Sequence, residues 1–72
     1  PMFNDEYGID EQYQRIRKLL LEAEPDLYKF IGRTKNDTAA IRARKIFKEI
    51  EGLLVPLRKS MQLQRQDNKS KY

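Results

Sequence analysis

The chain has 72 residues, contains neither Cys nor His, and carries a net charge of +4 from 15 basic and 11 acidic residues. This length corresponds to one small domain, and the missing residue types exclude disulfides, the usual zinc sites and imidazole catalysis. No apolar run approaches the roughly 20 residues that span a bilayer, and the acidic start is unlike a signal peptide. We therefore expect a soluble, cytoplasmic protein with no membrane contact.

The charges are unevenly spread along the chain. Residues 1–11 contain four acidic and no basic residues, and we expect residues 1–8 to form an acidic lead that is partly disordered. Residues 33–48 contain six basic residues against the single acid Asp37. Clustered charge of one sign attracts a partner of the other, so this split predicts a basic surface that meets a polyanion. A solvated helix face with ordinary solubility charges is the alternative.

A first helix is predicted over residues 9–31. Apolar residues recur there in alternating steps of four and three, which is the period of one helix face. The members of this first seam are Ile9, Tyr13, Ile16, Leu20, Ala23, Leu27 and Phe30. Because Pro25 lacks a backbone N–H donor, we expect a kink there or a short second helical segment after it. Gly32 fits the end of the helix, where a left-handed residue is needed.

A second helix is predicted over residues 38–64, with Asn36, Asp37 and Thr38 as candidate N-caps. Its apolar seam consists of Ala43, Phe47, Ile50, Leu54, Leu57 and Met61. Pro56 lies inside this pattern, so we expect the helix to bend there. Gly52, one turn earlier, weakens the helix at the same place. Residues 65–72 have no apolar periodicity, so we expect a disordered tail.

The predicted fold is all-α: an antiparallel two-helix hairpin over residues 9–64. A connection of five or six residues favours antiparallel neighbours, and the sequence shows no β alternation. The aromatic residues on the seams, Tyr13, Phe30 and Phe47, are predicted core residues. Because two helices cover only one side of each wide apolar stripe, we predict a homodimer that forms a four-helix bundle.

The basic cluster is the candidate binding site. Helix geometry places its bases on both flanks of the second seam, at the end of the hairpin, which suits phosphates better than base edges. The predicted nucleic-acid-binding residues are Arg33, Lys35, Arg42, Arg44, Lys45 and Lys48. The acidic residues alternate with basic neighbours, and motifs for phosphate loops, nucleophiles or metals are missing. We therefore predict no enzyme activity, no cofactor, no metal and no small-molecule substrate.

One part of the chain resembles a known family. The matching elements are Asp26-Leu27-x-Lys29-Phe30, the loop residue Asn36, Ala39-Ala40-x-Arg42-x-Arg44-Lys45, Ile50-Glu51 and Leu57-Arg58-Lys59. Over residues 26–60 the chain resembles the bacterial histone-like nucleoid proteins of the chlamydial linker-histone type. The resemblance implies a helical protein of the bacterial nucleoid that compacts duplex DNA through its backbone, with little sequence preference.

Two functions thus follow from the sequence. The first is a small nucleoid-associated protein that binds DNA, with RNA as an alternative polyanion. The second is a helical protein-interaction module, a small regulator or inhibitor that docks its apolar seam or its acidic start on a larger protein.

Overall fold

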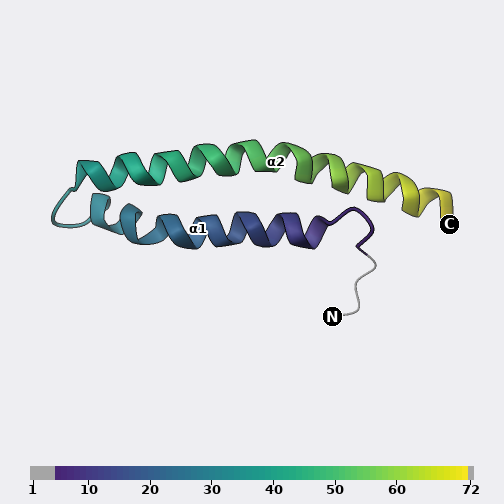
Figure 1. The fold of residues 1–72 in the computed structure, drawn as a ribbon, viewed down its shortest axis with the longest axis horizontal. Coiled ribbons are helices and arrows are strands. Elements are labelled where there is room, and N and C mark those ends of the chain that lie inside the picture. The colour runs from purple at the N-terminus through teal and green to yellow at the C-terminus, as the bar shows by residue number, and fades with distance from the viewer. Residues whose placement is uncertain (1–4, 72) are drawn as a thin grey trace.

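The computed structural model describes residues 5–71, and it describes the side chains of residues 5–70. Two helices account for most of this range: α1 spans Ile9–Ile31 and α2 spans Asp37–Lys71. They lie side by side in opposite directions, joined by a short loop (Figure 1). The molecule is elongated, with extents of 55 × 23 × 13 Å. The predicted all-α hairpin is confirmed, and residues 5–71 contain no strand.

The start of α1 is held by the acidic lead. The carboxylate of Asp5 accepts hydrogen bonds from the backbone N–H of Ile9 at 2.6 Å and of Asp10 at 3.0 Å. These are amides of the first turn, which have no partner inside the helix. Gly8 makes the turn between Asp5 and the helix with φ 67°, a left-handed conformation that glycine adopts without strain. Residues 5–8 of the predicted lead are therefore a cap for α1, whereas residues 1–4 lie outside the described residues.

The loop between the helices differs from the prediction at Gly32. This residue ends α1 with φ −81° and ψ −162°, which is not the left-handed conformation expected there. Its backbone N–H donates to the carbonyl oxygen of Tyr28 at 2.9 Å. Glycine is needed for another reason, because a Cβ at this position would lie 2.7 Å from that same oxygen. The left-handed residue of the loop is Lys35, with φ 46°.

The second helix begins at an asparagine cap and extends further than predicted. The Asn36 side-chain oxygen accepts the N–H of Ala39 at 3.1 Å, so Asn36 is the N-cap among the three candidates. At the other end, α2 continues past residue 64 to Lys71, and Tyr72 lies outside the described residues. Hydrogen bonds one turn apart, such as Gln64 to Asn68 at 2.9 Å, support these last turns. Residues 65–71 are thus helical where the lack of apolar periodicity predicts disorder.

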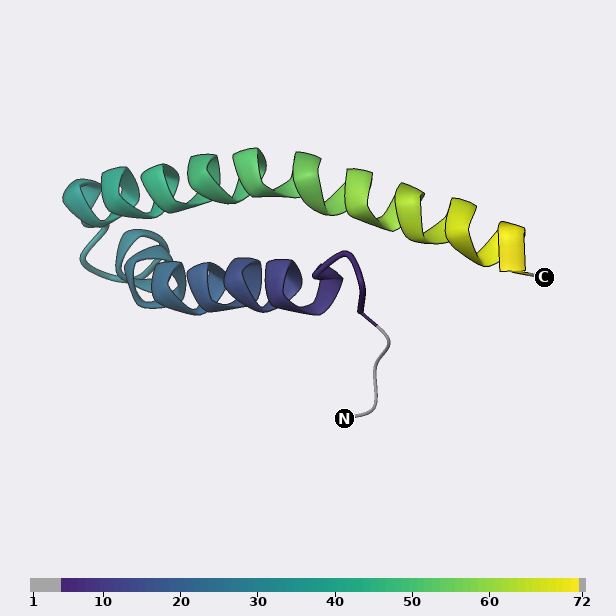
Figure 2. The ribbon, with the colours of Figure 1, turned by 45° about the vertical axis from the view of Figure 1, so that its right-hand side comes forward.

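Both prolines lie within continuous helices. α1 passes through Pro25 and α2 passes through Pro56. The last turns of α1 lie out of line with the earlier ones, and α2 curves along its length (Figure 2). A proline ring removes one backbone hydrogen bond and pushes against the preceding turn, which bends a helix without ending it.

The core between the helices is narrow and rich in alanine. The buried residues are Ile16, Ala23, Ala39, Ala43 and Ile50. At the open end of the hairpin, the Gln12 side-chain amide donates to the Ser60 hydroxyl at 2.8 Å and to the Tyr7 carbonyl oxygen at 3.1 Å. The Gln12–Ser60 contact shows that the part of α2 beyond residue 60 runs past the start of α1, as Figure 1 also shows.

The aromatic residues predicted for the core are not buried in this hairpin. Tyr13 is 50% exposed, Phe30 is 40% exposed and Phe47 is 39% exposed. The seam of each helix is wider than the strip that the other helix covers. In both seams the inward positions hold alanines and one isoleucine, Ile16 on α1 and Ile50 on α2. The larger side chains lie at the edge of the contact.

Two glycine substitutions should change stability in opposite directions. Gly52 lies inside α2, and a Cβ added there would have no neighbouring atom within 4 Å, so Gly52→Ala should raise the free energy of unfolding by about 1 kcal/mol through helix propensity. Gly32→Ala should lower it, because the new methyl group meets the Tyr28 carbonyl oxygen. Thermal unfolding followed by circular dichroism measures both. Equal shifts of the two variants would contradict the prediction.

Candidate nucleic-acid interface

The six predicted binding residues all lie at the loop end of the hairpin. Arg33 and Lys35 belong to the loop between α1 and α2, and the other four lie on the first three turns of α2. All six residues are exposed. The hairpin therefore carries this basic cluster at one end, opposite the acidic start of α1 (Figure 1).

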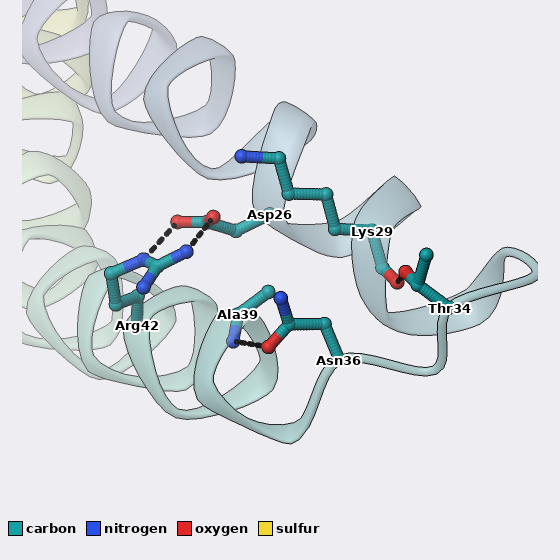
Figure 3. Close-up of polar contacts among 6 residues, drawn as sticks. All are labelled: Asp26, Lys29, Thr34, Asn36, Ala39 and Arg42. Carbon is teal, nitrogen blue, oxygen red and sulfur yellow. Dashed lines mark hydrogen bonds and ion pairs between the residues drawn. The ribbon is translucent and has the colours of Figure 1, made fainter.

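The loop holds its shape through the carbonyl oxygen of Lys29, the last basic residue of α1. This oxygen accepts the Thr34 hydroxyl at 3.0 Å and the backbone N–H of Asn36 at 3.3 Å. Lys35, between them, has a left-handed backbone that is uncommon for a residue with a side chain. These contacts lie beside the N-cap of α2 (Figure 3). The Thr34 hydroxyl and the Asn36 backbone N–H thus hold the loop that carries Arg33 and Lys35.

Arg42 differs from the other five basic residues because it binds an acid of α1. Its guanidinium donates two hydrogen bonds to the Asp26 carboxylate, at 2.8 Å and 3.1 Å (Figure 3). The Asp26 side chain is 16% exposed and the Arg42 side chain 49% exposed. The hydrogen bonds from Arg42 lower the pKa of Asp26, and the positive charge of Lys29 adds to this effect. The same contact raises the pKa of Arg42. This pair links α1 to α2. It also uses two guanidinium N–H groups that could otherwise donate to a phosphate.

The other α2 bases surround a shallow hollow. A concavity of about 510 Å³ is lined by Ile41, Arg44, Lys45, Phe47, Lys48 and Glu51. Three positive side chains and a partly exposed aromatic ring therefore share one surface with one acid. Beside it, Phe47 and Arg44 also border a hollow of about 400 Å³ that reaches Leu27 and Phe30 of α1. Such an open surface can hold several anionic groups.

The sequence prediction missed two contributors to this end of the molecule. Lys29 lies close enough to Asp26 to lower its pKa, so it adds a positive charge next to the loop. Asp26 itself removes Arg42 from the free bases. The Asp26–Arg42 spacing of 16 positions has no local signature, because it depends on how the two helices pack.

No group of three acidic side chains within residues 5–71 could hold a metal ion. Neither helix in that range has the length and hydropathy of a membrane-spanning segment.

The chain matches the family described as histone H1-like protein Hc1 over residues 10–67. The chain belongs to this family. A histone H1-like protein of this kind is a nucleoid-associated, DNA-binding protein that packages DNA, and the family is not one of enzymes. The match includes both helices and the loop that carries the basic cluster. No curated protein and no solved structure gives a significant match.

The Asp26–Arg42 ion pair should affect how this histone H1-like protein unfolds in acid. Because Arg42 lowers the pKa of Asp26, the pair stabilises the hairpin above the ordinary carboxyl pKa near 3.9, and this stability is lost as the pH falls through the lowered value. Asp26→Asn should therefore reduce the melting temperature at pH 7. Between about pH 5 and pH 2, the melting temperature of this variant should decrease less than that of the wild type. Melting curves across this range measure the effect. Glu22→Gln, an exposed acid on α1, is the control and should retain the wild-type profile.

Proposed function

We propose that this chain binds duplex DNA in the bacterial nucleoid through phosphate contacts with little sequence preference. The observation that carries the proposal is the group of exposed bases at the loop end of the hairpin. Five of the six predicted residues form no ion pair within residues 5–71: Arg33, Lys35, Arg44, Lys45 and Lys48. Basic side chains of this kind displace counterions from the DNA backbone, which drives binding that does not depend on sequence.

The side chains available at this end favour phosphates over bases. Sequence readout needs polar groups directed at base edges, most often from a helix that enters the major groove. Two neutral polar side chains beside the basic cluster are engaged elsewhere, because Thr34 binds a carbonyl oxygen and Asn36 caps α2. Most of the remaining donors are flexible Lys and Arg side chains. These donors position a protein on DNA without reading its sequence.

The salt dependence of duplex binding tests the proposal. If four of these five bases contact phosphates, the slope of log affinity against log salt is about −3.6, so affinity should fall roughly 150-fold between 50 and 200 mM salt. Duplexes of unrelated sequence should give the same curve. Absence of binding at about 50 mM salt, or a flat response to salt, would overturn the proposal. The same titration with duplex RNA tests whether the protein prefers DNA.

A second candidate, a helical module that docks on a larger protein, has one observation in its favour. Large apolar side chains are exposed on both helices, including Leu20 at 48% and Leu54 at 42%. Exposed apolar surface of this kind marks an interaction site. A chain that stays monomeric and fails to bind DNA would favour this candidate.

A further inference from the structure

Among the six bases of the basic cluster, Arg42 alone forms an ion pair within residues 5–71, and its partner offers the same kind of contact as a DNA phosphate. The Nε and one terminal nitrogen of Arg42 donate to the two carboxylate oxygens of Asp26, at 3.1 Å and 2.8 Å (Figure 3). A guanidinium binds a phosphate group with the same fork of two N–H donors. The Asp26 carboxylate therefore takes the contact that Arg42 would otherwise make with DNA.

The position of Arg42 does not exclude it from the interface. It lies three residues before Lys45 on α2, so the two side chains leave neighbouring points of the helix surface. Lys45 is exposed and forms no ion pair in the described part of the chain. The Arg42 side chain is 49% exposed, so a duplex bound at Lys45 has access to the guanidinium. What separates these two bases is the pairing of Arg42 with Asp26.

Three features favour Asp26 over a phosphate as the partner of Arg42. The Asp26 side chain is 16% exposed, so water can replace only part of the contact that its carboxylate would lose. The packing of α1 on α2 brings the two residues together within one folded chain, whereas a phosphate must be ordered when DNA binds. The carboxylate also stays charged, because the hydrogen bonds from Arg42 and the positive charge of Lys29 lower the pKa of Asp26.

We propose that Asp26 competes with DNA for Arg42 and thereby limits the affinity of the basic cluster, a role that rests on the function proposed above. In the wild-type chain Arg42 stays on Asp26, and only the free bases contact phosphates. Without the carboxylate, Arg42 turns to the duplex and adds one further phosphate contact. The ion pair thus links α1 to α2 and keeps DNA binding weaker than the number of bases at the loop end allows.

Removing the carboxylate should strengthen duplex binding. Asp26→Ala should change the slope of log affinity against log salt from about −3.6 to about −4.5, because one more contact contributes about 0.9. Affinity at about 50 mM salt should rise roughly tenfold. The matched control is Glu22→Ala, which removes the same charge from an exposed site one turn earlier on α1 and should leave the slope unchanged. Circular dichroism establishes that both variants remain helical.

A second variant, Arg42→Gln, tests the proposal in a chain that keeps Asp26. Because Arg42 makes no contact with DNA in the wild type, this substitution should leave the slope at about −3.6. Lys45→Gln, which removes one charge from the next turn, should reduce the slope to about −2.7. In the Asp26→Ala background, Arg42→Gln should return the slope from about −4.5 to about −3.6. A gain in Asp26→Ala that persists without Arg42 would show a general effect of charge and overturn the proposal.

Nuclear magnetic resonance of the Arg42 side chain follows the ion pair directly. The Nε–H signal should be protected from exchange with water in the wild type, unprotected in Asp26→Ala, and still protected when duplex is added to the wild type. Loss of this protection on adding duplex would show that phosphates displace Asp26, contrary to the proposal. Absence of duplex binding by the wild type would overturn this inference together with the proposed function. Salt-dependent binding with equal slopes in the wild type and Asp26→Ala would overturn this inference alone.

Discussion

Replacing Lys45 and Lys48 with Gln should reduce the salt slope of duplex binding per chain from about −3.6 to about −1.8. Both side chains lie on the first turns of α2, border the hollow at the loop end, and form no ion pair within the described chain. Each lost phosphate contact removes about one unit of slope, and affinity at low salt falls with it. Fluorescence anisotropy with a labelled duplex at several salt concentrations measures both quantities. The loss should be the same for duplexes of any sequence.

A matched variant separates the position of these charges from their number. Lys59→Gln with Lys69→Gln removes the same two charges from the exposed second half of α2. This control should keep most of the wild-type slope, because its bases lie far from the loop end. Equal losses in the two double variants would mean that DNA binding depends on net charge alone. That result would contradict an interface at the loop end.

Ile50→Ala should strongly destabilise the hairpin. Ile50 is 7% exposed, and it is one of only two large buried side chains in the described part of the chain, the other being Ile16. Removing a buried Ile side chain costs about 2–5 kcal/mol, and a chain of this size has a free energy of unfolding of only a few kcal/mol. We expect the melting temperature to fall by more than about 10 °C, or the helices to be unfolded at room temperature. Thermal denaturation followed by circular dichroism tests this.

The control for this effect is the same substitution at an exposed site of the same helix. Ile41 is 56% exposed on α2, so Ile41→Ala removes the same atoms without creating a cavity. Its melting temperature should change by no more than a few degrees, because alanine has the higher helix propensity and little burial is lost. A similar loss of stability in both variants would show that the core lies elsewhere.

Much of this fold could be predicted from local sequence patterns. The seven-residue spacing of Ile16 and Ala23, and of Ala43 and Ile50, places these residues on the inward face of each helix, and the structure buries all four. Asn36 was among the predicted caps, and its side chain does bind the first turn of α2. Such features depend on residues three or four apart, and a helix brings these together whatever the rest of the chain does.

Other features were not predictable because they depend on how much surface the partner helix covers. Tyr13, Phe30 and Phe47 lie on the predicted seams, yet they remain partly exposed because an alanine-rich contact strip is narrow. The helical conformation of residues 65–71 also has no apolar signal in the sequence. Polar side chains one turn apart suffice to support it.

By itself the sequence determined two helices, their turn, and a concentration of bases on the turn and the first part of the second helix. Helix formation and capping are local, so periodicity and composition carry that information. Only the tertiary structure decided which of those bases are free. The register between α1 and α2 brings Asp26 onto Arg42, 16 positions away, and leaves the other five without an ion pair in the described residues. A contact between distant residues depends on packing geometry, which no local pattern encodes.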